Sequence, residues 1–399
     1  MQIDVLIVGG GIFGTLLARE LARRGVRVAL YRVRDRPLPT AESLYNQAWF
    51  QSGLHYFKLG VSVARAFHDA KYLFQRRFRI PSGRGVMRIG PRHRDLFLAV
   101  AEELGIQAEV RAIGGRPAER MMGRFYRPPG ADTYFTVPDA PFPEAQIIQI
   151  AREQARRKGA LLRELDAPIR LEEHAGTISA LIGEQRVTAS RIVLACGCGT
   201  PRLLMSLGVD PRLKLVRTPL LVLKEQLTAR SGLRTPLLVD RTASYNAEPI
   251  AFAITKPLAG RMVFGVRQST PVALDDPEPR KQTKAEEQKL LEAFEAVTGL
   301  QASRGRRFAG GLEISSADAT DTDEVLPVIR RVPDFTNLWW ALPGRATMAM
   351  SLVETMLDEF ENDGLVNLAA TPHEPQGSSW EDLVEMFCSD SYDPSEEEE

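Results

Sequence analysis

Three glycines near the start of the chain have the spacing of a phosphate-binding turn. Residues 9–14 read G-G-G-I-F-G, which is the pattern G-x-G-x-x-G. In this pattern Gly9 permits a tight turn, Gly11 lets the backbone approach a diphosphate, and Gly14 allows a helix to contact a strand closely. The backbone N–H groups and the positive end of a helix beginning near Gly11 would stabilise the diphosphate. The spacing therefore predicts a dinucleotide-binding site.

The segments around this turn have the periodicity of a strand–helix–strand unit. Residues 3–8 (IDVLIV) form an apolar run, typical of a strand buried on both faces of a parallel sheet. Residues 12–24 switch to helical periodicity, Gly25 follows as a helix stop, and residues 26–31 form a second strand. A βαβ unit around the glycines makes the dinucleotide interpretation much stronger than the motif alone.

Arg32 stands where such a unit normally has an acidic residue. That acid accepts hydrogen bonds from the adenosine ribose, whereas arginine can only donate. Three interpretations fit. Arg32 caps a ribose 2′-phosphate, which would mean NADP; it lies over the adenine of FAD while Asp35 or another group serves the ribose; or the nucleotide is bound weakly or has been lost.

The rest of the chain alternates between two kinds of pattern. Helical periodicity marks helices at about 60–78, 144–158, 283–298 and 346–362. Apolar runs mark further buried strands at 191–195 and 338–341. Residues 85–145 and 215–275 are short apolar runs broken by glycine and proline, typical of an antiparallel sheet. We therefore expect an α/β fold, with a Rossmann-like parallel-sheet domain and an inserted antiparallel-sheet substrate domain.

Several segments resemble one family of flavoenzymes. Residues 43–56 (SLYNQAWFQSGLHY) are similar to the stretch that follows the second strand in the D-amino-acid oxidase / glycerol-3-phosphate dehydrogenase superfamily of FAD enzymes. Its 2-hydroxyglutarate dehydrogenase-like branch looks nearest, as does the helix at 60–78 that leads to I-P-S-G-R-G-V-M-R-I. Residues 195–201 (ACGCGTP) resemble the second glycine motif, and residues 326–349 resemble the C-terminal segment that closes over the flavin.

The resemblance implies both a domain organisation and a cofactor. The FAD-binding domain would comprise residues 1–80, 140–215 and 310–368, and the substrate domain residues 81–139 and 216–309. Hydride would leave a C–H bond beside an amine or hydroxyl of a small 2-hydroxy acid, amino acid or amine, and the electrons would pass on to oxygen or another acceptor. The residues expected to contact FAD are Gly9, Gly11, Ile12, Phe13, Gly14, Arg32, Gln47, Ser52, Gly53, Cys196, Gly197, Gly344 and Thr347.

Four polar residues are candidates for the chemistry itself. His55 is the candidate base, because the ordinary pKa of histidine lies near neutrality, although a hydrogen-bonded structural histidine is an equal alternative. Gln51, where the branch usually has histidine, would position the flavin or the substrate. Arg267 and Arg345 are candidates to hold a substrate carboxylate through two hydrogen bonds.

Composition excludes several other classes of protein. The chain has 399 residues, with 51 Lys plus Arg and 51 Asp plus Glu, so no overall field attracts nucleic acid or anionic lipid. No apolar run is long enough to span a membrane, and the N-terminus does not resemble a signal peptide. Three cysteines, Cys196, Cys198 and Cys388, indicate neither a disulfide framework nor a metal site. We expect a cytoplasmic protein that acts on a small molecule.

Residues 369–399 form an acidic tail. Residues 378–388 place Trp380, Leu383, Val384 and Phe387 on one side of a short amphipathic helix. A helix this short needs a surface, so it either docks on a protein partner or neighbouring subunit, packs on its own body, or stays disordered.

Three functions follow from these observations. The first is an FAD-dependent oxidoreductase of small amines or hydroxy acids. The second is a degenerate flavoprotein-fold subunit that binds a partner through its tail and performs no redox chemistry. The third is an NADP-dependent enzyme, which Arg32 alone favours.

Overall fold

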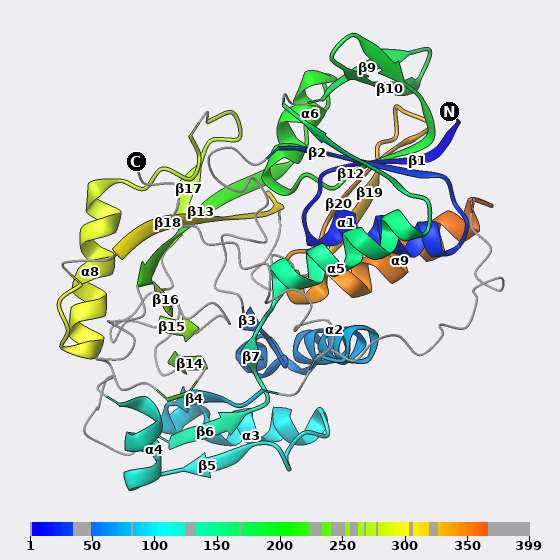
Figure 1. Cartoon of the computed structure of the whole chain (residues 1–399). Helices are drawn as coiled ribbons and strands as arrows, with labels where there is room; N and C mark the ends of the chain where they lie inside the picture. The colour runs from blue at the N-terminus through cyan, green and yellow to red at the C-terminus, as the bar shows by residue number, and fades with distance from the viewer. Residues whose placement is uncertain are drawn as a thin grey trace.

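Two large β-sheets, one mainly parallel and one mainly antiparallel, form the framework of the protein (Figure 1). The computed structural model describes residues 2–34, 49–80, 83–123, 133–166, 169–223, 234–235, 237–240, 252–255, 262–266, 269–276, 278–302, 306–318 and 326–365. The acidic tail at 369–399, including the expected helix at 378–388, lies outside these residues.

The mainly parallel sheet has six strands. In spatial order they are β19 (Val328–Arg331), β20 (Leu338–Leu342), β12 (Ala189–Leu194), β1 (Ile3–Val8), β2 (Val28–Val33) and β8 (Leu161–Leu165). Neighbours run parallel except β19 and β20. The strand–helix–strand unit predicted at the start of the chain is confirmed as β1, α1 (Ile12–Arg23) and β2.

Hydrophobic layers cover both faces of this sheet, which explains why β1 is apolar at successive positions. Val5 and Ile7 belong to the core formed with α1, α5 (Glu144–Arg157) and α9 (Ala349–Asn362). Leu6 and Val8 belong to the core on the opposite face. That face is covered by α6 (Thr200–Ser206) and a three-stranded sheet. The three strands are β9 (Arg170–His174), β10 (Thr177–Ile182) and β11 (Gln185–Val187).

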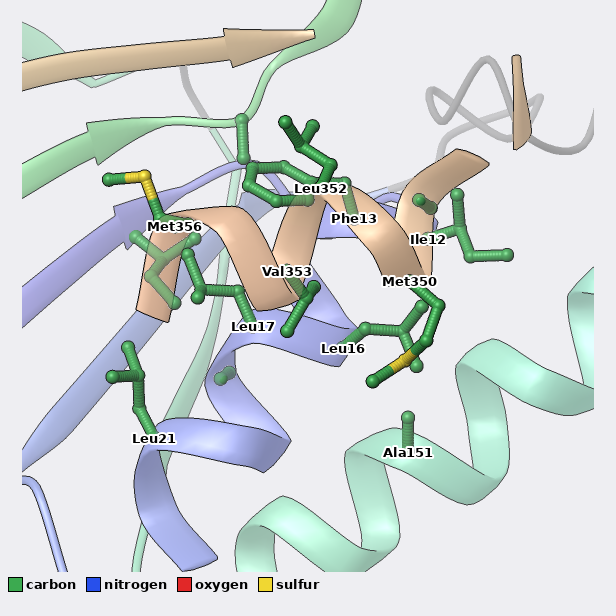
Figure 2. Packing of buried hydrophobic residues seen from close by; sticks show 14 of the residues in the cluster. Ile12, Phe13, Leu16, Leu17, Leu21, Ala151, Met350, Leu352, Val353 and Met356 are labelled. Carbon is green, nitrogen blue, oxygen red and sulfur yellow. The ribbon is translucent and has the colours of Figure 1, made fainter. Parts of the chain in front are cut away.

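The helical layer brings the beginning and the end of the described chain together. Figure 2 shows Leu16 and Leu17 of α1 facing Met350 and Val353 of α9, with Ala151 of α5 alongside. All five side chains are buried. The C-terminal helix predicted at 346–362 is therefore confirmed, with its first residues forming a short 3-10 helix, η6 (Ala346–Met348).

The mainly antiparallel sheet has nine strands. They are β4 (Gly85–Ile89), β5 (Arg111–Ile113), β6 (Thr133–Val137), β13 (Leu213–Leu223), β14 (Leu237–Asp240), β15 (Phe252–Thr255), β16 (Met262–Val266), β17 (Thr270–Val272) and β18 (Arg306–Ser316). Only β4 and β14 pair in parallel among these described strands. Helix α8 (Lys284–Thr298) packs on one face through Leu290 and Phe294.

The prediction of strands alone over residues 85–145 was wrong in two places. The region also contains α3 (Arg94–Glu103) and α4 (Gly115–Met122), and a 3-10 helix, η3 (Pro91–His93), precedes α3. Helix α3 buries Phe97 and Val100 against the sheet. Helix α3 has only 10 residues, so the helical period of its apolar side chains is hard to distinguish from the alternation of a short strand.

A small ribbon and one long helix connect the two sheets. Strands β3 (Trp49–Phe50) and β7 (Ala140–Pro141) pair antiparallel, and a 3-10 helix, η2 (Leu54–Leu59), leads into α2 (Val61–Phe78). Helix α2 buries the stripe that the sequence predicts, including Phe67 and Phe74. Within the described residues, no helix combines the length and apolar character needed to cross a membrane.

Two of the predicted domain boundaries fall inside strands. The boundary after residue 215 lies within β13, and the boundary after residue 309 lies within β18. These two strands pair with each other along their full length in the antiparallel sheet. The division into domains stays a prediction.

Candidate active site

The glycine turn has the close contacts that its sequence predicts. Gly9 has a φ of 123°, and a Cβ placed there would lie 2.3 Å from the carbonyl oxygen of Ala195. A Cβ on Gly14 would lie 2.1 Å from the carbonyl oxygen of Gly9. Gly11 is the N-cap residue of α1. The backbone of β1, the turn and β12 thus approach one another as closely as a dinucleotide-binding turn requires.

The other side of the turn is held by side chains from three elements. The carbonyl oxygen of Gly10 accepts hydrogen bonds from Thr15 Oγ1 (3.1 Å) and from Arg152 Nη2 of α5 (2.8 Å). A Cβ on Gly10 would lie 2.7 Å from Cδ of Arg32, so the arginine side chain lies against the turn. The Arg32 guanidinium is paired with Glu164 of β8, its Nε lying 2.9 Å from Oε1.

The second glycine segment joins the ends of β1 and β12. The carbonyl oxygen of Val8 accepts hydrogen bonds from the backbone N–H of Ala195 (2.8 Å) and from the thiol of Cys196 (2.9 Å). Burial raises the pKa of the Cys196 thiol to about 12, so the group is a neutral donor at physiological pH. Gly197 follows with a φ of 54° at the start of a 3-10 helix, η4 (Gly197–Gly199). Cys196 and Cys198, both partly buried, form no disulfide within the described residues.

Segment 49–53, which the family resemblance places at the flavin, is fixed by a buried carboxylate. Asp139 accepts hydrogen bonds from the backbone N–H of Ser52 (2.8 Å) and from Trp49 Nε1 (2.8 Å). Gly53 has a φ of 91°, and a Cβ there would lie 2.0 Å from the carbonyl oxygen of Ala64. The segment therefore cannot be displaced without breaking several contacts at once.

Asp139 and its neighbour Lys71 form a buried polar centre that the sequence analysis missed. Burial raises the pKa of Asp139, against the opposing effects of Lys71 and of the hydrogen bonds from Ser52 and Trp49. Burial lowers the pKa of Lys71, against the attraction of Asp139. Lys71 Nζ also donates to the carbonyl oxygen of Pro138. Asp139 thus binds segment 49–53 directly, and Lys71 interacts electrostatically with Asp139.

A chain of polar contacts connects Gln51 to the antiparallel sheet. The Tyr56 hydroxyl donates to Gln51 Oε1 (3.0 Å), and Arg345 Nε donates to the Tyr56 oxygen (3.4 Å). Arg345 Nη1 lies 2.5 Å from Oε2 of Glu313 in β18. The backbone N–H of Gln51 lies 3.5 Å from Thr347 Oγ1. Three of the predicted site residues, Gln51, Arg345 and Thr347, are thus brought together.

Burial and neighbouring charges shift the pKa values of Tyr56 and Arg345. Burial raises the pKa of the Tyr56 hydroxyl, and the nearby Arg345 cation opposes the rise. Burial alone would lower the pKa of Arg345, but the carboxylate of Glu313 and the oxygen of Tyr56 raise it above its ordinary value. Near neutral pH the Tyr56 phenol therefore stays protonated and the Arg345 guanidinium stays charged. Tyr56 and Glu313 are further residues that the sequence analysis did not identify.

The remaining predicted site residues have different outcomes. His55 is half-buried, its ring centroid lying 4.3 Å from that of Trp49 and 4.9 Å from that of Tyr56. Gly344, predicted in the closing loop, has a φ of 66°. Gln47 and Arg267 lie outside the described residues. No group of three His, Cys, Asp or Glu side chains in the described part of the chain could hold a metal ion.

The residues present fit a dinucleotide such as FAD. The glycine turn has no room for side chains at Gly9 and Gly14, and the N-terminus of α1 begins between them, after its N-cap residue Gly11. Segment 49–53 contributes a buried hydroxyl at Ser52, beside the Asp139 carboxylate that binds the backbone N–H of the same residue.

Comparison with protein-family models identifies the class. The model named DAO, FAD dependent oxidoreductase, matches residues 4–350, so the chain belongs to this family of FAD-dependent oxidoreductases. FAD is the cofactor of the family, and enzymatic oxidoreduction is its activity. No curated protein sequence matches the chain.

Solved structures with the same fold come from enzymes of related types. L-proline dehydrogenase from P. horikoshii is similar with a TM-score of 0.69 and 14% identity, covering 92% of this chain and 96% of that one. Glycine oxidase from Bacillus cereus has a TM-score of 0.63 and 16% identity, covering 92% and 98%. Glycerol-3-phosphate dehydrogenase from Bacillus halodurans, complexed with FAD, has a TM-score of 0.65 and 16% identity, covering 92% and 66%. At these identities the likeness shows the fold alone, and the 2-hydroxyglutarate dehydrogenase-like branch stays a prediction.

Proposed function

We propose that the protein oxidises the C–H bond next to the nitrogen of a small amino acid or amine and passes the electrons to FAD. The observation that carries this proposal is the ion pair between Arg345 and Glu313, at the end of the polar chain that begins at Gln51. Bound FAD supplies the hydride acceptor. A hydroxy acid, which offers an oxygen in place of the nitrogen, is the alternative substrate class.

The ion pair favours a zwitterion over a simple anion. Arg345 does not stand alone as an anchor for a carboxylate, because Glu313 already neutralises it. Side by side, the two groups present one cation and one carboxylate, the combination that complements an α-carboxylate and an ammonium group. The side chains are 28% and 40% exposed, so both are accessible to a small molecule. The names of the L-proline dehydrogenase and the glycine oxidase with this fold agree with such a substrate.

Each residue of the cluster has a proposed role. Arg345 holds the substrate carboxylate, and Glu313 accepts a hydrogen bond from the substrate nitrogen. Tyr56 stays protonated because its pKa is raised, so its hydroxyl fixes Gln51 rather than serving as a base near neutral pH. His55, next to Tyr56, is the proposed acceptor of the proton that the nitrogen loses. Arg267 remains a second candidate for the carboxylate.

The overall step balances with one cofactor. The substrate ammonium first gives one proton to His55, and a hydride then leaves the neighbouring carbon, which gives an iminium ion; bound FAD would take up the hydride with its two electrons. The chain's own contribution is to hold the C–H bond at the flavin and to keep the nitrogen hydrogen-bonded. An outside electron acceptor, oxygen or another oxidant, then restores FAD.

An anaerobic substrate screen tests the proposal. Purified full-length protein should be yellow, and its flavin absorption should bleach with an amino acid or amine from a panel that also contains the matching 2-hydroxy acids. Bleaching by hydroxy acids alone would contradict the amine assignment. A colourless protein that does not bind added FAD would contradict the enzymatic function and favour a non-catalytic subunit.

A further inference from the structure

The missing ribose-binding acid has a counterpart on the neighbouring strand. Arg32 is the next-to-last residue of β2, at the position where an acidic residue normally accepts hydrogen bonds from the adenosine ribose. In β8, the adjacent parallel strand, Glu164 is the register partner of Arg32. The carboxylate is therefore one strand further from the glycine turn, at the same carboxyl edge of the sheet, a shift of about 4.8 Å.

Contacts place this carboxylate on the face of the glycine turn. A Cβ placed on Gly10 would lie only 2.7 and 2.8 Å from two carbon atoms of the Arg32 side chain, so this side chain fills the space beside Gly10. The guanidinium at the end of the same side chain binds Glu164. Gly10, Arg32 and Glu164 thus form a row that starts at the diphosphate site and leads toward the adenosine end.

Glu164 has the acceptor capacity that a ribose requires. Arg32 Nε donates to Oε1 at 2.9 Å, and Arg34 Nε lies 3.7 Å from Oε2. An ionised carboxylate offers about four lone-pair sites, so the Arg32 contacts do not exhaust it. The Glu164 side chain is also 45% exposed, which leaves the carboxylate accessible.

We propose that Glu164 accepts the hydrogen bonds of the adenosine ribose hydroxyls of FAD, and that Arg32 holds its carboxylate in place. In place of the usual acid on β2, the ribose would be bound by a carboxylate on the neighbouring strand β8. The ion pair also argues against a ribose 2′-phosphate, because the Arg32 cation is already paired with a carboxylate and Glu164 would repel a second anion. Selectivity for FAD over a 2′-phosphorylated nucleotide follows.

Displacement of FAD by two nucleotides that differ only in the ribose hydroxyls tests the proposal. Full-length protein loaded with FAD is titrated with ADP and with 2′,3′-dideoxy-ADP, and flavin fluorescence reports release. The wild-type protein should bind ADP about 10-fold or more tightly than the dideoxy analogue, since hydrogen bonds to a charged group have this strength. In Glu164→Gln this preference should fall to about threefold or less, and FAD itself should dissociate more readily.

A matched control separates the ribose contact from a loss of structure. Glu153 is a partly exposed glutamate of α5 that pairs with Arg156 and Arg157. Glu153→Gln should keep the wild-type preference for ADP. The proposal is overturned if Glu164→Gln retains that preference, which would assign the ribose to another residue. It is equally overturned if the wild-type protein does not distinguish the two nucleotides or binds neither.

Discussion

Arg345 and Glu313 form an ion pair with 2.5 Å between Nη1 and Oε2, and the two residues come from different parts of the framework. Arg345 is the N-cap residue of the 3-10 helix η6, which leads into α9 of the helical layer. Glu313 belongs to β18 of the antiparallel sheet. The proposed substrate-recognition groups are therefore supplied jointly by the segment that leads into the helical layer and by the antiparallel sheet.

Substitution of Glu313 should distinguish amine from carboxylate recognition. In Glu313→Gln, KM for an amine or amino acid should rise by about 10- to 100-fold, because a hydrogen bond to a charged group is lost. KM for a substrate without the nitrogen should change much less. Steady-state kinetics with a matched amino acid and 2-hydroxy acid measure the difference. Glu172→Gln, at a surface ion pair with Arg186, is the control, and equal effects on both substrates would refute the assigned role.

A methyl group on Gly14 should disrupt the dinucleotide turn. A Cβ there would lie 2.1 Å from the carbonyl oxygen of Gly9, and backbone cannot yield as a flexible side chain can. Gly14→Ala should lower the free energy of unfolding by about 3 kcal/mol and release FAD. Urea denaturation and the flavin content of purified protein are the measurements. Gly114→Ala is the control, because a Cβ at Gly114 meets nothing within 4 Å; unchanged flavin content in Gly14→Ala would be inconsistent with this geometry.

The buried Tyr56 hydroxyl should contribute to the pH dependence of stability above pH 10. Burial raises its pKa above the ordinary value of 10.0. A group with a raised pKa in the folded state contributes stability that is complete below pH 10 and is lost as the pH rises through the folded pKa. The free energy of unfolding should therefore fall by up to about 1.4 kcal/mol per pH unit.

Tyr56→Phe removes this contribution. The variant should be less stable than the wild-type protein at pH 8, since the hydrogen bonds to Gln51 and Arg345 are lost, but the difference should shrink between pH 10 and 11. Denaturation curves at several pH values measure it. Tyr72→Phe, at an exposed position, should follow the wild-type curve throughout. Parallel curves for wild type and Tyr56→Phe would show that the hydroxyl does not titrate differently on unfolding.

A buried ion pair should stabilise the antiparallel sheet only while both partners are present. Arg88 of β4 and Asp240 of β14 pair at 2.6 Å, with side chains 5% and 2% exposed. Asp240→Leu should lower the free energy of unfolding by about 3–5 kcal/mol, because the Arg88 charge stays buried without its carboxylate. The double variant Arg88→Met/Asp240→Leu should recover most of the loss. A double variant no more stable than the single one, by urea denaturation, would contradict this explanation.

The fold was predictable where the signals are local. The glycine turn, the apolar run before it and the helical period after it identify a dinucleotide site within a few tens of residues, and the structure contains the expected βαβ unit. Helices α2, α5, α8 and α9 were likewise predictable because each carries a long amphipathic pattern or ends at a glycine. Helices α3 and α4 are shorter, and the sequence pattern of this region predicts strands instead.

The missed site residues share a different property, since their roles depend on contacts between distant segments. Asp139 stands in V-P-D-A-P, which has the composition of a turn, yet it binds Ser52 and Trp49 far earlier in the chain. Glu313 is one polar residue in a strand, and only the fold brings Arg345 to it. Arg32 was recognised as a departure from the motif, but its partner Glu164 could not be found without the register of β2 and β8.

Strand β12 lies between β1, from the beginning of the chain, and β20, from near its end. During synthesis, β1 and β2 leave the ribosome long before β12 exists, and β12 exists long before β20 covers its open edge. An exposed edge strand readily pairs with other chains, so each delay is a period of aggregation risk. The FAD-binding core can close only after residue 342 has emerged, which makes its maturation a late event in the life of the nascent chain.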